Sequence, residues 1–267
     1  MKLSIVVSTQ PASFSALAYK GKVTENIAKI KEFGYDGVEL AVRDPNLLNI
    51  DDLKSVLSNN NLPVSAIGTG QAYGEEALSF TDPDEEVRKK AIDRIKSHIQ
   101  LAAELKAVVI LGLIRGTKKT DVTDNLAEEW LIAAIQECAS ENKNVRLVIE
   151  PINRYETNLL NTVTAGMEFV NKVKMDNVVL LLDTFHMNIE EPNIFESIIL
   201  AKERLFHFHV ADSNRWYPGA GHIDFKKVIQ MLSDINYQGY ISGEILPLPD
   251  PDTAAQKTID HLGPMIV

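Results

Sequence analysis

Cysteine is nearly absent from this chain, since Cys138 is the only one among 267 residues. A single thiol excludes an intrachain disulfide framework and any all-thiolate metal site. Long apolar runs are absent too, because no segment approaches the roughly 18 apolar residues that a membrane helix needs. The N-terminal stretch MKLSIVVSTQ has too short an apolar run for a signal peptide. We therefore expect a soluble, cytoplasmic protein with no membrane partner.

Basic residues are outnumbered, with 27 Lys and Arg against 37 Asp and Glu and a formal net charge of −10. An acidic chain repels phosphate backbones, so nucleic-acid binding would need a local basic stripe. The one short basic cluster, RKK at residues 88–90, has acidic residues just before it at 82, 84, 85 and 86. We interpret it as a solvated helix face and expect no nucleic-acid partner.

Linkers rich in Pro, Gly or Ser are missing as well, and no change of composition divides the chain. Eight short runs rich in Val, Ile and Leu alternate with longer amphipathic segments. Parallel strands that are covered on both faces have this composition. The runs begin at Leu3, Gly37, Pro63, Ala107, Val145, Val178, Leu205 and Tyr240.

The clearest helical pattern covers residues 82–105, with Asp82 as the expected N-cap and Pro83 at the first helical position. His98 in this helix is predicted to be a surface residue. The segment before it, from residue 68, is predicted to be a long loop. Eight strand–helix alternations predict an α/β protein, a single-domain (β/α)8 TIM barrel over residues 1–267, since such barrels have about 250 residues. An open doubly wound sheet is the alternative, but no G-x-G-x-x-G motif follows a strand.

Acidic side chains occur at the ends of the later strands. The fifth run ends in Glu150, the sixth in Asp183, and the eighth carries Glu244 near its end. The seventh carries His207 and His209, of which only His209 lies near enough to the C-terminal end to reach the rim. A TIM barrel has its active site at the C-terminal ends of its strands, which lie about 4.8 Å apart. We therefore expect these groups to converge at one rim.

Three converging carboxylates would be costly without a cation, because burying an ionised carboxylate costs several kcal/mol. A divalent metal ion removes this cost. Carboxylate oxygens with one imidazole suit Mn²⁺, with Co²⁺, Mg²⁺ and Zn²⁺ as alternatives. Other roles stay open for single residues: Asp183 could cap the following turn, and Glu150 could pair with Arg154.

Four segments resemble the D-tagatose/D-psicose (allulose) 3-epimerase family of the xylose-isomerase-like TIM-barrel superfamily. They are VIEPINRYE, LLLDTFHMNIEE, HFHVADSNRWYPGAGHIDF and YISGEILP, in the same order over nearly the whole second half. LSFTDPDEEVRKKAIDRIKSHIQLAAEL adds weaker support in the first half. The resemblance implies one divalent metal, usually Mn²⁺ or Co²⁺, with the ligands Glu150, Asp183, His209 and Glu244. It also implies substrate contacts at Glu156, His186 and Arg215.

The resemblance implies an isomerase that inverts the carbon next to the carbonyl of a ketose or keto-sugar acid through a cis-enediolate. One base removes a proton from one face and a second group returns one to the other. Glu150 on the fifth strand and Glu244 on the eighth, with two strands between them, fit this two-base exchange. A positioned base accelerates a reaction by about 10²–10⁴-fold, which corresponds to roughly 3–5 kcal/mol. Enzymes lower the activation free energy by at least about 8 kcal/mol, so a base alone is not enough. The metal would supply much of the rest as a Lewis acid.

Two further arginines bear on the substrate. Arg43 and Arg115 follow the second and fourth predicted strands and should face the same rim. Because Arg binds carboxylates and phosphates with two parallel hydrogen bonds, they indicate a keto-acid or a phosphate ester rather than a neutral ketose. An ion pair with a neighbouring acid is the alternative, with Asp44 for these two and with Asp212 for Arg215.

Other functions remain open at this stage. They are an aldose–ketose isomerase of a sugar or sugar phosphate, a metal-dependent phosphodiesterase or apurinic endonuclease, a dehydratase of a keto-polyol, and a non-catalytic sugar-binding barrel. The net charge of −10 argues against an enzyme that binds DNA. Relatives in the resembled family are often homo-oligomers, so we also expect a homo-oligomer.

Overall fold

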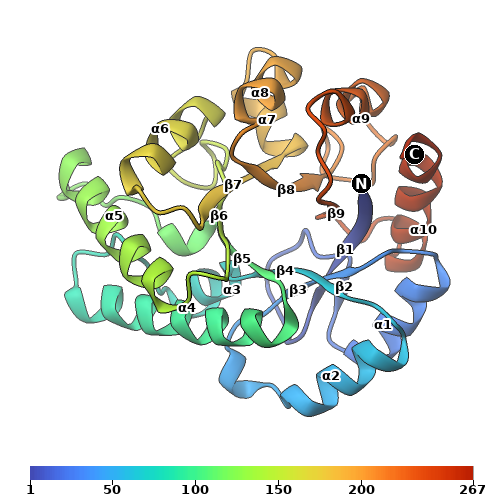
Figure 1. Cartoon of the computed structure of the whole chain (residues 1–267), viewed down its shortest axis with the longest axis horizontal. Coiled ribbons are helices and arrows are strands. Elements are labelled where there is room, and N and C mark those ends of the chain that lie inside the picture. The colour runs from blue at the N-terminus through green and yellow to red at the C-terminus, as the bar shows by residue number, and fades with distance from the viewer. Residues whose placement is uncertain (267) are drawn as a thin grey trace.

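A closed parallel barrel forms the centre of the computed structural model, which describes residues 1–266 (Figure 1). The order around the barrel is β1-β3-β4-β5-β6-β7-β8-β9, and β9 pairs with β1 to close it. Every strand pair is parallel. The barrel strands are β1 (Lys2–Ser8), β3 (Val38–Ala41), β4 (Val64–Gly68), β5 (Val108–Leu111), β6 (Leu147–Ile149), β7 (Val178–Asp183), β8 (Leu205–Val210) and β9 (Tyr240–Gly243).

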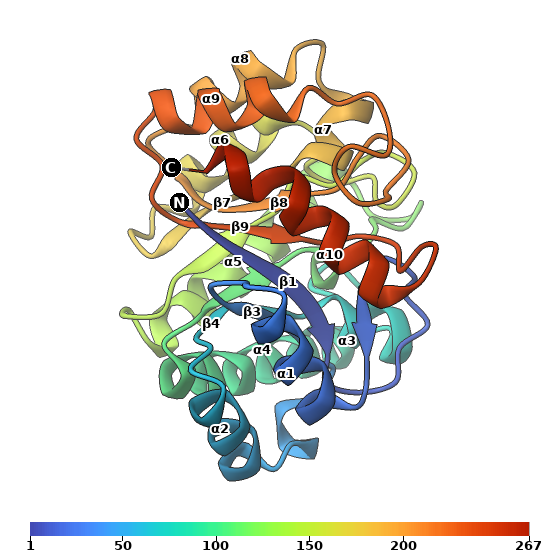
Figure 2. The ribbon, with the colours of Figure 1, turned by 90° about the vertical axis from the view of Figure 1, so that its right-hand side faces the viewer.

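Helices surround the barrel on its outside, as the two views show (Figures 1 and 2). They are α1 (Val23–Glu32), α2 (Ile50–Asn59), α3 (Gly70–Glu76), α4 (Glu85–Leu105), α5 (Asp124–Glu141), α6 (Val163–Val173), α7 (Thr184–Glu190), α8 (Ile194–Ala201), α9 (Phe225–Asp234) and α10 (Pro251–Leu262). Short 3₁₀ turns cover Pro45–Leu47, Leu113–Arg115 and Gly263–Met265. Within residues 1–266, each helix is too short or too polar to span a bilayer. The predicted single-domain TIM barrel is confirmed, and each of the eight apolar runs coincides with or overlaps one barrel strand.

Two details of the chain differ from the sequence-based expectation. The extra strand β2 (Tyr19–Lys20) pairs with the end of β1 and was not predicted. The expected loop after β4 contains the helix α3, whose Gly-rich sequence has little helical periodicity. Helix α4 begins two residues later than predicted, because Asp84 rather than Asp82 caps it by accepting the Glu86 N–H at 2.9 Å.

The prediction that His98 lies on the surface is wrong. The side chain is fully buried on the inner face of α4. Its Nδ1 lies 2.8 Å from the Arg94 carbonyl oxygen and its Nε2 lies 2.8 Å from the Val42 carbonyl oxygen. A neutral imidazole has one N–H, which one of these carbonyls accepts, and helical spacing alone did not reveal the Val42 carbonyl.

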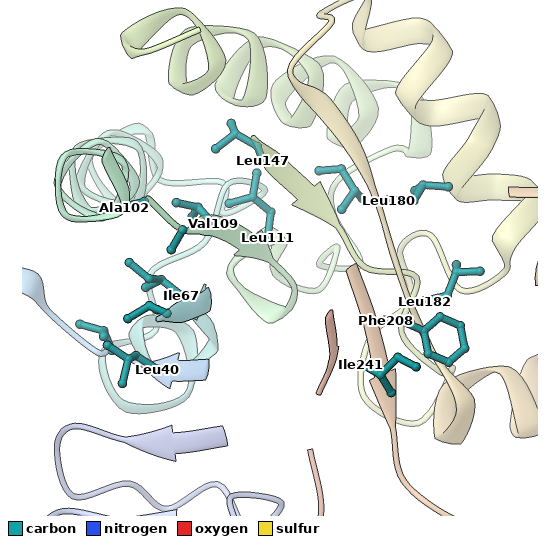
Figure 3. Packing of buried hydrophobic residues seen from close by; sticks show 14 of the residues in the cluster. Leu40, Ile67, Ala102, Val109, Leu111, Leu147, Leu180, Leu182, Phe208 and Ile241 are labelled. Atoms are coloured by element: carbon teal, nitrogen blue, oxygen red, sulfur yellow. The ribbon is translucent and has the colours of Figure 1, made fainter. Parts of the chain in front are cut away.

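Alternation along the strands divides the side chains between two cores. In β7, Leu180 and Leu182 belong to the large cluster between strands and helices, parts of which Figure 3 shows. Val179 and Leu181 belong instead to the small cluster inside the barrel. Because successive side chains point to opposite faces, Asp183 continues the inward series. The apolar strand thus directs its terminal carboxylate to the barrel axis.

We expect Leu180→Ala to lower the free energy of unfolding by about 2–5 kcal/mol, because it removes a fully buried side chain and leaves a cavity. Leu200→Ala on α8 is the matched control, since Leu200 is 50% exposed and should change stability little. Urea denaturation followed by circular dichroism measures both. Equal losses for the two variants would contradict the division into core and surface.

Candidate active site and metal centre

The same alternation brings the four predicted metal ligands to one place. Glu150 follows the inward Val148 of β6, and His209 lies level with Asp183 in the pairing of β8 with β7. One oxygen or nitrogen atom from each ligand residue lies within 4.8 Å of the corresponding atoms of the others. The set comprises Glu150, Asp183, His209 and Glu244. The strand ends therefore form a cluster that could hold a divalent metal ion.

Three atoms of this cluster are buried without a hydrogen-bond partner in the described chain. They are Glu150 Oε1, Asp183 Oδ2 and His209 Nδ1. An unpaired buried polar atom costs about 1–3 kcal/mol, and more when it is charged. Lone pairs of two carboxylates and one imidazole that face one another are the donor set of a cation site. The residues therefore fit the metal that the sequence predicts.

Asp183 performs both of the roles that the sequence left open. Its Oδ1 accepts the N–H of Phe185 at 2.8 Å and so caps α7, while Oδ2 faces the cluster. The alternative partner of Glu150 is not realised, because the guanidinium of Arg154 pairs with Glu190 at 2.7 Å. Glu150 instead has room beside Gly112, where a Cβ atom would lie 2.8 Å from Glu150 Oε2.

Charge crowding is visible in the ionisation of Glu244. Burial, together with the nearby charges of Glu150 and Asp183, raises the pKa of Glu244 to about 8 even though Arg215 opposes the shift. Without a cation, Glu244 therefore stays largely protonated at neutral pH, and the cluster carries less than its full negative charge. A divalent ion would relieve the same repulsion by placing positive charge among the carboxylates.

Glu39 is a site residue that the sequence analysis missed. It is buried at the inward position of β3, and both carboxylate oxygens lie 3.1 Å from His209 Nε2. One of them also lies 2.8 Å from His207 Nε2, inside the barrel. A carboxylate on one ring nitrogen orients the other nitrogen toward a metal. The signal was present, because Glu39 is the lone acidic residue of the run GVELAV.

Beside the cluster, His186 occupies the wall of a cavity. Its Nδ1 lies 2.7 Å from the amide Nδ2 of Asn153, and its Nε2 lies 3.7 Å from both Glu150 Oε1 and Asp183 Oδ2. An amide N–H can only donate, so the neutral ring accepts at Nδ1 and carries its hydrogen on Nε2. This hydrogen points toward the carboxylates of the cluster.

Arg215 joins the cluster to the cavity. Its guanidinium donates to Glu156 Oε1 at 2.7 Å and to Glu244 Oε2 at 2.8 Å, and it lies over the Phe185 ring. Its φ of +62° is uncommon for a residue with a side chain and stores local strain. The alternative ion pair with Asp212 is not formed, because that carboxylate accepts backbone N–H groups of its own loop.

Arg43 and Arg115 lie outside the cavity. The buried Arg115 guanidinium donates to the backbone carbonyls of Leu111 and Glu150, so it supports the strand ends rather than facing a ligand. Arg43 pairs with Glu76 at 3.6 Å, and its alternative partner Asp44 pairs with another arginine. Neither side chain lines the cavity, so the structure gives no support to a substrate contact by either one.

The cavity itself has a volume of about 300 Å³ and opens above the cluster. Its walls include Glu150, His209 and Glu244 of the cluster as well as the predicted substrate contacts Glu156, His186 and Arg215. The structure thus brings seven of the nine predicted site residues together, the seven being Glu150, Glu156, Asp183, His186, His209, Arg215 and Glu244.

We expect Glu39→Gln to weaken binding of Mn²⁺ or Co²⁺ by roughly 10–100-fold, since the amide loses the charge that orients His209. Isothermal titration of the metal-free protein measures the affinity directly. Glu137→Gln, at an exposed ion pair on α5, is the control and should bind metal like the unmodified chain. Unchanged affinity in Glu39→Gln would show that the carboxylate only fills the barrel.

Comparisons with known proteins agree with this geometry. A model of the xylose isomerase-like TIM barrel family matches residues 27–265. An L-ribulose 3-epimerase of Methylomonas sp. is 34% identical over 227 residues, which cover 82% of this chain and 76% of that protein. A 3-dehydro-D-guloside 4-epimerase of Escherichia coli is 28% identical over 249 residues, 88% of this chain and 90% of its own.

Solved structures extend the similarity to the whole fold. The crystal structure of a D-allulose 3-epimerase from Methylomonas sp. in complex with D-allulose superposes with a TM-score of 0.84 at 26% identity. The match covers 99% of this chain and 97% of that one. These relatives are epimerases, which are enzymes of the isomerase class. This chain therefore belongs to the xylose isomerase-like TIM barrel family.

Proposed function

We propose that this protein is a divalent-metal-dependent epimerase that inverts a carbon next to the ketone of a sugar, as ketose 3-epimerases do. The observation that carries the proposal is the convergence of Glu150, Asp183, His209 and Glu244 beside a cavity, where the first three each have an unpaired buried atom. The relatives named as 3-epimerases of L-ribulose and D-allulose support the same reaction class.

The four cluster residues would hold the metal, with His209 contributing Nδ1 because Glu39 occupies its Nε2. When bound, the ion supplies Lewis-acid stabilisation of negative charge that develops on the sugar oxygens. We propose Mn²⁺, with Co²⁺, Mg²⁺ and Zn²⁺ as alternatives. A cytoplasmic location and a homo-oligomeric state are further parts of the proposal, and the second of them rests on the family resemblance.

The proton transfers fall to Glu150 and Glu244. A carboxylate oxygen of one removes the proton from the carbon next to the ketone, and the carboxyl group of the other returns a proton to the opposite face. Strands β6 and β9, which carry them, are separated by β7 and β8, so the two carboxylates approach a bound sugar from different sides. The net result is inversion at one carbon with no change in the number of atoms.

The cavity side of the site would hold the substrate. The N–H at His186 Nε2 and the guanidinium of Arg215 can donate to the carbonyl end of the sugar. Glu156 accepts from Arg215 at 2.7 Å and from the amide of Asn153 at 2.9 Å. The same amide donates to His186 Nδ1, so both donors are held in place. Among the described residues that line the cavity, Arg215 is the one Arg or Lys. This favours a neutral sugar over the keto-acid or phosphate ester that Arg43 and Arg115 indicated.

A 4-epimerase of a keto-glycoside is the second candidate. The Escherichia coli relative with that type of name aligns over 90% of its own length, compared with 76% for the L-ribulose 3-epimerase. Both reactions invert a carbon next to a ketone and need the same two proton-transferring groups. The position of the ketone in the accepted substrate distinguishes them.

We expect Glu150→Gln and Glu244→Gln each to lower turnover by about 10²–10⁴-fold or more, because each removes a proton-transferring group. Incubation of metal-loaded protein with ketoses and keto-glycosides in D₂O, followed by NMR, shows which carbon exchanges its hydrogen. Glu128→Gln, on an exposed ion pair of α5, is the control. Exchange at the unmodified rate in either site variant would exclude the two-base mechanism.

Chelator dialysis should abolish epimerisation, and Mn²⁺ should restore it in proportion to the metal taken up, because the developing charge loses its stabilisation. Metal content by mass spectrometry and product formation by NMR are followed on the same samples. Activity that persists in protein with no bound metal would contradict the proposal.

A further inference from the structure

Another buried polar atom without a partner belongs to a residue that lines the cavity away from the metal cluster. Gln71 is 5% exposed and lines the cavity, and its Oε1 has no hydrogen-bond partner among the described residues. It is the second residue of α3, which directly follows β4. In the ring of eight strands, β4 is four positions from β8 and so lies opposite His209. Gln71 therefore stands on the wall across the barrel from the cluster.

The orientation of this amide is fixed by its neighbours. The hydroxyl of Ser8 donates its single hydrogen to the backbone carbonyl of Gln10. The Ser8 oxygen can therefore only accept from Gln71, whose Nε2 lies 2.6 Å away. This identifies the NH₂ end of the amide as the one that faces Ser8. The carbonyl end, Oε1, is left without a partner on a side chain that lines the cavity.

The Ser8–Gln10 side of this chain of hydrogen bonds is itself anchored. The side-chain oxygen of Gln10 accepts the backbone N–H of Arg43 at 3.0 Å, and its amide nitrogen donates to the carbonyl of Asp44 at 3.3 Å. Gln71 is thus held by a continuous network between the ends of β1 and β3. Such a network keeps the free acceptor in one position before any ligand arrives.

The wall around Gln71 leaves space for a ligand. Gly68, Gly70 and Gly74 also line the cavity there and present no side chains. A buried carbonyl oxygen that stays unpaired is unfavourable, and a hydroxyl group is the donor that a sugar offers at every carbon away from the ketone. An anionic group of a ligand would be repelled by the same oxygen.

We propose that Gln71 is a specificity-determining residue, which accepts a hydrogen bond at Oε1 from a sugar hydroxyl remote from the reacting carbon. The inference rests on the proposed function, because the metal cluster and Arg215 on the opposite side of the ring then take the carbonyl end of the sugar. The distal hydroxyls of the same molecule extend toward β4 and α3. A site built to pair a hydroxyl rejects analogues that lack it.

Gln71→Met tests this inference, since the side chain keeps its length but loses the acceptor. The metal-loaded protein and the variant are compared with the preferred ketohexose or keto-glycoside and with its deoxy analogues, one for each distal hydroxyl. In the unmodified protein, one analogue should lose roughly 10–100-fold in kcat/KM. In Gln71→Met the parent sugar should lose about as much, and that analogue should no longer be disfavoured.

The split between KM and kcat separates a substrate contact from a structural role. Loss of a remote contact that is equally strong in the ground and transition states raises KM and leaves kcat nearly unchanged. Ser8→Ala is a second variant, which keeps Oε1 but frees the amide to turn, and it should reduce the same discrimination in part. Gln136→Met on α5, whose amide donates to a backbone carbonyl outside the cavity, is the matched control and should discriminate like the unmodified protein.

The outcomes are distinct. If Gln71→Met and Ser8→Ala both discriminate among the deoxy analogues as the unmodified protein does, the role of Gln71 is disproved while the epimerase function stands. If the unmodified, metal-loaded protein exchanges no carbon-bound hydrogen of any sugar tested, the proposed function itself fails, and the inference fails with it.

Discussion

Repulsion among carboxylates at the barrel mouth is the constraint on which the rest of the site depends. Two unit charges about 4 Å apart interact by about 4 kcal/mol at an effective dielectric constant near 20, so a buried cluster of acids is unstable by itself. One cation, the guanidinium of Arg215, lies beside the cluster and pairs with Glu244 and Glu156. It leaves the centre of the cluster unpaired, at Glu150 Oε1 and Asp183 Oδ2. The negative charge and the donor atoms around this unpaired centre are those that a divalent cation binds.

Strand alternation explains why so much of this could be predicted from the sequence. The runs of Val, Ile and Leu are local signals, and each marks a strand whose outward residues, such as Leu180 and Phe208, pack under the helices. Once the strands are assigned, the inward parity and the polar residue at the end follow without knowledge of distant contacts. The prediction of the eight strands and of the convergence of Glu150, Asp183 and Glu244 needs only these local signals and the alternation of side chains.

The residues that were misjudged all depend on non-local partners. His98 has a surface-like sequence context, but the Val42 carbonyl, 56 residues away, allows its burial. Arg115 follows a strand as a ligand-binding arginine would, yet carbonyl groups of two strand ends occupy its guanidinium. Glu39 acquires meaning only beside His209, which is 170 positions further along. Hydrophobic periodicity contains no information about such pairs. The chemistry of a single side chain is compatible with several partners and does not predict which one it meets in the fold.

The placement of these groups divides the cavity into two halves with different demands. The half built from β6 to β9 contains the charged residues, whose positions are tied together by mutual repulsion, by Arg215 and by Glu39, so that a change in one disturbs the others. The half built from β4 and α3 contains glycines, the oriented amide of Gln71 and the carboxylate of Glu75, which accepts from Ser13, and no ion pair ties it to the metal cluster. Relatives with names as different as L-ribulose 3-epimerase and 3-dehydro-D-guloside 4-epimerase are what this division leads one to expect. A coupled set of charges resists substitution, whereas an uncoupled wall can be altered to accept another sugar while the chemistry stays the same.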